Sequence, residues 1–131
     1  MSDLLRRRRA MMEKKSDIHK LPLIYFKGLD RRYNTYTDMG NRASTAIDLP
    51  IKNGQTMVIT VPSDIQAAVG AWREDTKVLE LFGGWNLNLR YTPTVDVLAK
   101  IVVRRSDNNY ITDGEFAGKI DVQIGENIYK S

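Results

Sequence analysis

The sequence has 131 residues, with 20 Lys/Arg, 16 Asp/Glu, a net charge of +4 and no cysteine. This length fits one ordinary domain with a single hydrophobic core, and the lack of cysteine excludes disulfides, thiolate metal sites and a thiol nucleophile. The single histidine, His19, is too few for a histidine-based catalytic triad or a multi-histidine metal centre, so no enzyme, cofactor or metal site is expected.

Residues 1–20 are predicted to form a basic arm that carries the whole charge excess. They hold seven Lys/Arg and three Asp/Glu, which leaves 13 of each sign in residues 21–131. Strong helix formers follow a candidate N-cap at Ser2 or Asp3, and no Gly or Pro occurs before Pro22, so a short α-helix is predicted. A lone helix of this length is marginal in water and is expected to dock on a partner, on copies of itself or on the body. The residues predicted to anchor and oligomerise the chain are Leu4, Leu5, Arg6, Arg7, Arg8, Arg9, Met11 and Met12.

The arm lacks the signals of membrane insertion and of nucleic-acid recognition. No apolar run approaches the ~18 residues that span a bilayer, and no apolar region follows the basic stretch as in a secretory signal. Four arginines in a row could contact phosphates, but no aromatic residues interleave them and no reading motif is present. A protein surface is therefore the favoured partner, and neither a membrane nor a nucleic acid is expected.

From residue 21 onward the apolar residues alternate, which predicts β-strands. The segment "RASTAIDLP" places Ala43, Thr45, Ile47 and Leu49 on one face of a predicted strand. Asn53-Gly54 in "IKNGQTMVITVP" is a strong tight-turn signal and predicts a β-hairpin. The second arm of this hairpin is expected to direct Met57, Ile59 and Val61 to the core.

The C-terminal half continues the same alternation. "WNLNLRYTP" predicts one half-buried strand whose Trp85, Leu87, Leu89 and Tyr91 face the core. "VLAKIVVRR" and "KIDVQIG" predict two further strands, joined by a loop that Ile111 and Phe116 are expected to pin to the body. About eight short strands without long helical segments between them predict a mainly β fold, an antiparallel β-sandwich of jelly-roll type over residues 21–131.

Two segments resemble a known class of module. "IDLPIKNGQTMVITVPSDIQAAVGAWRED" and "GGWNLNLRYTPTVDVLAKIVVRRSDNNYITDGEF" are similar to small β-sandwich modules of structural proteins from phages of gut bacteria, and to carbohydrate-binding-like modules of gut bacterial surface proteins. The similarity covers roughly residues 45–116, and the leader "LLRRRRAMM" also looks like the start of such virion proteins. The sequence departs from the module at Trp72-Arg73-Glu74-Asp75. The matching positions are Ile51, Gly54, Val58, Ile59, Gly84, Trp85, Tyr91, Pro93, Ile101, Val102, Val103, Arg104, Ser106, Asp107, Asn108, Ile111, Thr112 and Glu115.

The resemblance implies a virion structural protein of head-fibre, decoration or tail-tip type, assembled in the host cytoplasm. In this interpretation the arm anchors the chain to capsid, connector or baseplate subunits and oligomerises it, with a trimer as the expected form. The sandwich would then be displayed outward for host-surface attachment. The alternative interpretation is a carbohydrate-binding module that recognises bacterial surface glycans.

Candidate glycan contacts follow from the chemistry of sugar recognition. Exposed aromatic rings stack on sugar faces while amides and carboxylates select hydroxyl groups. Trp72, Trp85 and Tyr91 are each either such a platform or a core residue, and the alternation with Leu87 and Leu89 favours the core for Trp85 and Tyr91. A calcium site at Asp107, Asn108, Asp113 and Glu115 lacks EF-hand spacing. Glu74-Asp75 and Asp113-Glu115 are better explained as solvated turn residues than as the carboxylate pair of a glycoside hydrolase. The candidate glycan contacts are Trp72, Asp107, Asn108 and Tyr110.

Overall fold

The computed structural model describes residues 18–32 and 35–126. These residues form one short 3-10 helix and nine strands. The elements in chain order are η1 (Ile18–Lys20), β1 (Leu23–Leu29), β2 (Tyr36–Thr45), β3 (Leu49–Ile51), β4 (Thr56–Thr60), β5 (Ile65–Arg73), β6 (Leu79–Asn86), β7 (Asn88–Tyr91), β8 (Val97–Arg105) and β9 (Asp121–Gly125).

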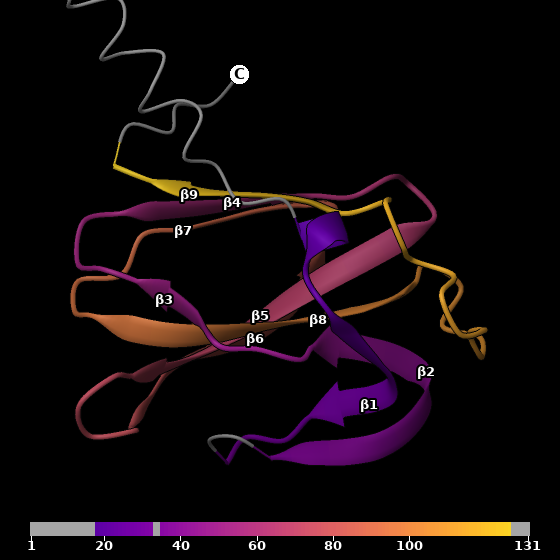
Figure 1. Cartoon of the computed structure of the whole chain (residues 1–131), viewed down its shortest axis with the longest axis horizontal. Coiled ribbons are helices and arrows are strands. Elements are labelled where there is room, and N and C mark those ends of the chain that lie inside the picture. The colour runs from indigo at the N-terminus through magenta and orange to yellow at the C-terminus, as the bar shows by residue number, and fades with distance from the viewer. Residues whose placement is uncertain (1–17, 33–34, 127–131) are drawn as a thin grey trace, which may run out of the picture.

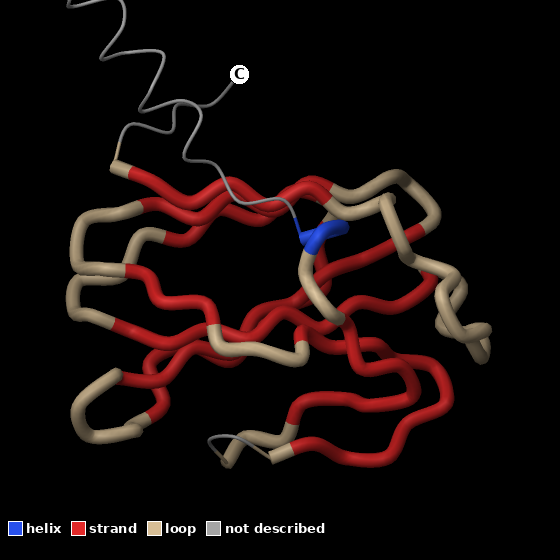
Figure 2. The backbone as a smooth tube through the Cα atoms, in the orientation of Figure 1, coloured by secondary structure: helices blue, strands red, loops and turns tan. Residues whose placement is uncertain are grey.

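The strands form two facing layers, which Figure 1 shows one above the other and Figure 2 shows as strand tubes. One layer is a six-stranded sheet in the order β1-β2-β8-β5-β6, with β3 also paired to β8, and the other is a three-stranded sheet in the order β7-β4-β9. All the pairings are antiparallel. The prediction of a mainly β, antiparallel β-sandwich is confirmed. A jelly roll divides eight strands between two sheets, whereas the described residues divide nine strands into six and three.

The core fills the space between the two sheets, because alternate residues of each strand point inward. On β4, Met57 and Ile59 are fully buried, and Val61 just beyond it is 7% exposed, as predicted. Ile111 and Phe116, in the long loop between β8 and β9, are also buried and fix that loop to the body, as predicted. The inward residues of the two central strands of the six-stranded sheet are Ile65, Ala67, Val69 and Ala71 on β5 and Val97, Ala99, Ile101 and Val103 on β8.

The β1–β2 hairpin curls over part of the outer face of the six-stranded sheet. The Trp72 indole N–H donates to the Arg31 carbonyl at 3.4 Å, and the Arg31 guanidinium lies 5.2 Å from the centre of the Phe82 ring. Within the hairpin, the pairing register shifts between Tyr25 and Lys27, with Phe26 at a φ of +66°. Trp72 is therefore 1% exposed although it points away from the main core.

The prediction of a β-hairpin at Asn53-Gly54 is wrong. The turn forms, with Gly54 at a φ of +88°, but the strands on either side of it do not pair with each other. β3 pairs with β8 in the six-stranded sheet, whereas β4 pairs with β7 and β9 in the three-stranded sheet. The turn therefore carries the chain from one layer to the other.

The strand predicted across residues 43–49 is interrupted. β2 ends at Thr45 and β3 begins at Leu49, and both segments pair along the same edge of β8. In the gap the Thr45 hydroxyl accepts the backbone N–H of Ile101 at 3.1 Å, so a side chain replaces a missing ladder bond. Ile47 is 42% exposed and does not face the core, contrary to the prediction.

The single strand predicted across residues 85–91 is also wrong. β6 ends at Asn86 in the six-stranded sheet, and β7 begins at Asn88 in the three-stranded sheet. Leu87, at the crossing, is 42% exposed. Leu89 and Tyr91 pack against the core as predicted, but Trp85 lies outside it.

The start of the body lies against the three-stranded sheet. η1 contacts β9, and the His19 ring nitrogen Nδ1 lies 3.4 Å from the carbonyl oxygen of Ile120. The helix predicted for the arm over residues 1–20 lies mostly outside the described residues, as do its anchoring residues from Leu4 to Met12. Its last three residues, Ile18–Lys20, form the 3-10 helix η1 and no α-helix. The boundary between arm and sandwich stays a prediction. Within the described parts of the chain no helix is long and apolar enough to cross a membrane.

Candidate ligand-binding site

Residues 106–110 form a tight loop that follows β8 and is tied to the neighbouring β4–β5 turn. The Ser106 backbone N–H donates to the Asp64 carbonyl at 2.9 Å, and the Ser106 hydroxyl donates to the Ser63 carbonyl at 2.8 Å. The Asn108 N–H donates to the Arg105 carbonyl at 2.9 Å, and Asn108 has a φ of +61°. Asn tolerates this left-handed conformation better than most residues, which explains the turn-forming run Ser106–Asn109.

Arg105 holds two acidic side chains of this region. Its Nε and Nη2 donate to the two carboxylate oxygens of Asp107 at 3.0 and 2.9 Å, and its Nη1 lies 3.5 Å from Glu115 Oε2. The Asn109 N–H also donates to Asp107. The hydrogen bonds from Arg105, and then that from Asn109, lower the pKa of Asp107 to about 2. Asp107 therefore stays ionised across the physiological range.

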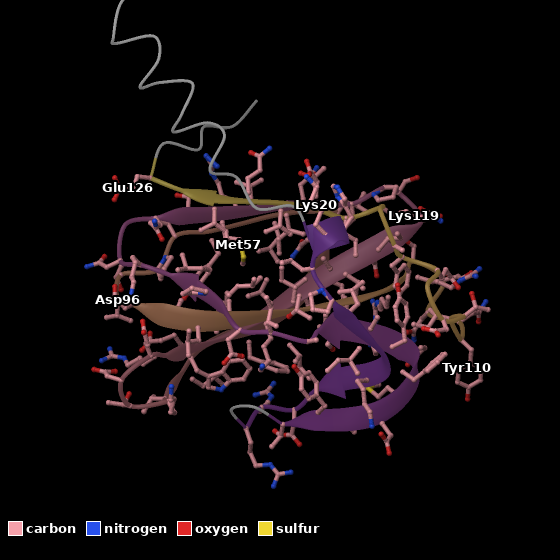
Figure 3. All side chains as sticks on the ribbon, in the orientation of Figure 1. Lys20, Met57, Asp96, Tyr110, Lys119 and Glu126 are labelled. Atoms are coloured by element: carbon pink, nitrogen blue, oxygen red, sulfur yellow. The ribbon has the colours of Figure 1, made fainter. Side chains whose placement is uncertain are left out.

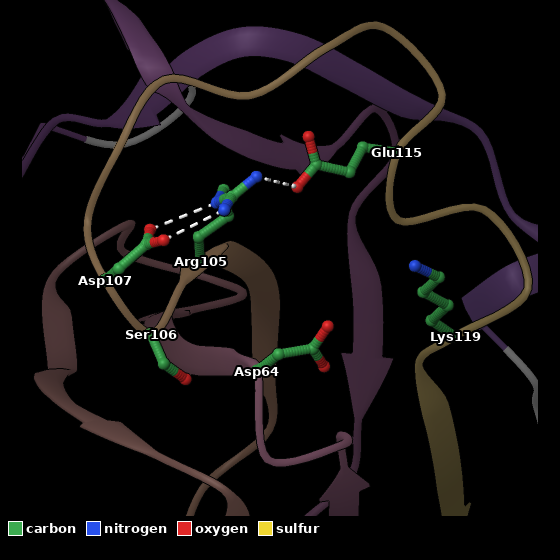
Figure 4. A pocket seen from close by; sticks show the side chains of 6 residues that line it. All are labelled: Asp64, Arg105, Ser106, Asp107, Glu115 and Lys119. Carbon is green, nitrogen blue, oxygen red and sulfur yellow. Dashed lines mark hydrogen bonds and ion pairs between the residues drawn. The ribbon is translucent and has the colours of Figure 1, made fainter.

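A shallow cavity of about 430 Å³ opens beside this arginine (Figure 4). Three of its charged groups are acidic and two are basic, and the lining also includes one hydroxyl. Among the described residues no group of three or more His, Asp or Glu side chains is placed to hold a metal ion. The cavity offers hydrogen-bond donors and acceptors to a polar ligand, and it is lined by Asp64, Arg105, Ser106, Asp107, Glu115 and Lys119.

A second cluster lies beyond the loop, on the outer face of the six-stranded sheet. Asn108 links the two places, because its side-chain oxygen accepts from Arg42 Nη1 at 2.7 Å and from Asn41 Nδ2 at 3.0 Å. Arg42 comes from β2 and is 9% exposed. The loop thereby fixes a buried arginine of a distant strand.

Two guanidinium groups of this cluster lie over one tryptophan ring. The Arg104 and Arg42 guanidinium carbons are 4.1 and 4.7 Å from the centre of the Trp85 ring. Arg104 Nε also donates to the side-chain oxygen of Gln66 at 2.9 Å. Burial lowers the pKa of Arg42, and the charge of Arg104 lowers it further; burial also lowers the pKa of Arg104.

A β-bulge explains why Trp85 lies outside the core. Gly83 pairs with the inward-facing Val69, so regular alternation would also point Trp85 inward. However, Asn86 pairs with Ala67. Between these two pairs β6 advances by three residues while β5 advances by only two. The extra residue reverses the alternation and turns Trp85 to the outer face. The sequence signal that could have indicated this is Gly84, because glycine inside a strand often marks a bulge.

The four candidate glycan contacts have different positions. Trp72 is 1% exposed, and its ring lies where a β-carbon on Gly70 would be, so it has no free face for a sugar. Tyr110 is 83% exposed and projects from the loop end in Figure 3, with one edge against Gly40. Tyr110 shares the loop with Asp107 and Asn108. The structure thus brings three of the four candidates together. It adds Trp85, for which the sequence favoured the core over a sugar contact, and Arg42 and Arg104, which the sequence did not indicate as glycan contacts.

A comparison with protein-family models, curated proteins and solved structures finds no match to this chain.

Proposed function

We propose that this chain is a non-enzymatic structural protein of a phage particle. Residues 1–20 form a short helical arm that docks on neighbouring virion subunits and brings copies together, with a trimer as the expected form. The β-sandwich, a jelly-roll relative in this proposal, is displayed from the particle. Its loop end contacts other virion proteins or the host surface.

The position of the two ends of the described body supports this proposal most directly. Lys20 lies in η1, which contacts β9, and Glu126 directly follows β9, so both ends of the described body lie at the three-stranded sheet (Figure 3). The Arg42–Trp85–Arg104 cluster lies on the outer face of the opposite sheet. An attachment through the arm would therefore leave that face turned away from the point of attachment.

A truncation tests this role of the arm. A chain lacking residues 1–17, which keeps η1 against β9, is compared with the full chain and with a control lacking residues 127–131, which leaves the arm intact. We expect the truncated chain to be monomeric by light scattering and absent from particles, while both other chains oligomerise and are incorporated. Incorporation of the truncated chain at the full-length level would contradict the proposal. A parallel loss of DNA affinity would support nucleic-acid binding by the arm instead.

A carbohydrate-binding module is the second candidate function, and the exposure of Tyr110 favours it. Its ring is 83% exposed and lies against Gly40, the neighbour of Asn41 in the chain, and Asn41 donates to the side-chain oxygen of Asn108. Sugar-binding surfaces combine such an aromatic ring with planar hydrogen-bonding groups. We expect Tyr110→Ala to reduce glycan binding, measured with a multivalent display of the chain. The control is Phe26→Ala, which removes a different exposed aromatic ring, on β1. Equal binding by both variants and the unmodified chain would remove this candidate.

A further inference from the structure

Two arginines face each other across a pair of strands on the outer face of the six-stranded sheet. Ala43 on β2 pairs with Val103 on β8, and both side chains point into the core. One step along the same antiparallel register places Arg42 opposite Arg104, and alternation turns both outward. Like charges directly opposite on an antiparallel pair are destabilising. The pair therefore needs a compensating negative charge or a strong local contact.

Trp85 supplies part of that compensation but no charge. Both guanidinium groups lie within 5 Å of its ring centre, at 4.1 and 4.7 Å, which is the range of cation–π attraction. Within residues 18–32 and 35–126, neither Arg42 nor Arg104 forms a salt bridge. The nearest acidic residue along the loop is Asp107, and its carboxylate is paired with Arg105 instead. Among the described residues, these two positive charges thus have no counter-charge.

Several N–H groups of the two guanidiniums form no hydrogen bond with the described residues. Arg42 uses Nη1 for Asn108 and for the Asn41 carbonyl, and Arg104 uses Nε for Gln66. Arg104 is half-buried and Arg42 is 9% exposed, and neither guanidinium has a fully buried nitrogen without a partner, so the unused nitrogens keep contact with solvent, most of all those of Arg104. Paired N–H groups of this kind match the two oxygens of a carboxylate.

The groups around the two arginines favour a sugar as the bearer of that carboxylate. Amides from Asn41, Gln66 and Asn108 border the cluster, and the exposed Tyr110 ring lies two residues further along the same loop. Amides bind hydroxyl groups, and an exposed ring stacks on the apolar face of a pyranose. An acidic peptide would use the arginines but would leave the aromatic ring and most of the amides without a role.

We infer that the Arg42–Trp85–Arg104 cluster is a binding site for the carboxylate of an acidic sugar, such as a uronate in a bacterial surface polysaccharide. Arg104 and Arg42 hold the carboxylate, and Tyr110 contacts the adjoining ring. This inference rests on the carbohydrate-binding function and not on particle assembly, so a failure of the arm truncation leaves it unaffected.

The test uses the full chain on a tetravalent support, because linked copies reveal weak sites. The probes are arrayed acidic polysaccharides, oligogalacturonate, its methyl ester, which is neutral, and oligoglutamate peptide. We expect retention on acidic polysaccharides, loss of binding on methyl esterification, and a change in tryptophan fluorescence on titration, since Trp85 lies at the site. Arg104→Gln should weaken binding by about tenfold or more, because it removes a charge-assisted bond.

A matched control is Arg90→Gln, which removes the same charge from β7 of the opposite sheet and should change affinity by less than about twofold. Circular dichroism establishes that both variants fold. Equal binding of the methyl ester would overturn the carboxylate site but retain a carbohydrate-binding function. Retention on none of the acidic glycans would overturn the inference, and so would equal binding of oligoglutamate or an unchanged affinity in Arg104→Gln.

Discussion

Lys100 and Asp48 form an ion pair on the outer side of the six-stranded sheet, where Lys100 is 4% exposed. The Lys100 ammonium group also lies 5.2 Å from the centre of the Tyr36 ring. Burial lowers the pKa of Lys100, but the hydrogen bonds with Asp48 and Tyr36 outweigh this effect and raise the pKa overall. A buried lysine on the central strand β8 is therefore kept charged by a residue from the β2–β3 connection.

Asp48→Ala is expected to destabilise the protein by about 2 kcal/mol, less than a fully buried pair would lose because Asp48 is partly exposed. The cost arises because Lys100 remains buried without its main counter-charge. The double variant Asp48→Ala with Lys100→Met should recover most of the loss. Urea unfolding measures both, and Asp38→Ala, which breaks the exposed pair with Lys27, should leave the unfolding midpoint nearly unchanged. A double variant no more stable than Asp48→Ala would contradict this account.

Gly70 is expected to be essential for the packing of Trp72. A β-carbon at Gly70 would lie 2.6 Å from Trp72 Cη2 and 3.4 Å from a ring carbon of Phe82. Gly70→Ala should therefore destabilise the protein by about 1–3 kcal/mol through overpacking. Gly83→Ala is the matched control on the neighbouring strand, since its β-carbon would approach only Leu81, at 4.0 Å. Thermal unfolding compares the two, and equal melting temperatures would show that the Trp72 ring can move aside.

The Arg105–Asp107 pair predicts a defined pH dependence. The folded pKa of Asp107 is about 2, whereas the ordinary value is 3.8. Because the folded pKa is depressed, the pair stabilises the protein fully above about pH 4 and this contribution is lost as the pH falls toward about 2. Carboxyl ¹³C NMR should show Asp107 titrating near pH 2 in the unmodified chain. In Arg105→Gln its pKa should return toward the ordinary range, and an unchanged titration would contradict the role of Arg105.

Asn108 combines a strained backbone with a side-chain link, and two substitutions separate these effects. Asn108→Gly removes the bond to Arg42 but suits the φ of +61°. Asn108→Ala removes the same bond and adds a left-handed alanine, which costs about 1 kcal/mol more. The alanine variant should therefore melt at the lower temperature. Equal melting temperatures would mean that the loop relaxes out of the left-handed conformation.

The alternation of apolar residues was sufficient to predict the sandwich and much of its core. Met57, Ile59 and Tyr91 face the core because their strands keep a strict two-residue period. Ile111 and Phe116 were recognisable as anchors because they are isolated apolar residues in a polar loop. These features depend only on the local sequence, which is why they could be predicted.

Strand partners and the arginine cluster could not be predicted in the same way. The Asn53-Gly54 signal specifies a chain reversal but not the sheet that each flanking strand joins. Trp85 lies outside the core because a one-residue bulge in β6 reverses the direction of its side chain. A bulge of one residue hardly changes the alternation of apolar residues in the sequence, so the pattern did not indicate it. Arg42 and Arg104 meet only through the pairing of β2 with β8, which are far apart in the sequence. The strand partners and the arginine cluster therefore depend on pairing between distant strands, which the local sequence pattern does not specify.

The irregularity at Phe26 in β1 has a consequence for crowded copies of the chain. β1 lies at the rim of the six-stranded sheet, where free backbone groups could recruit a strand from an adjacent molecule. The register shift between Tyr25 and Lys27 breaks that row of donors and acceptors, so a neighbour finds no continuous template. Copies held close together on one support are therefore expected to remain separate and not to pair edge to edge into fibres.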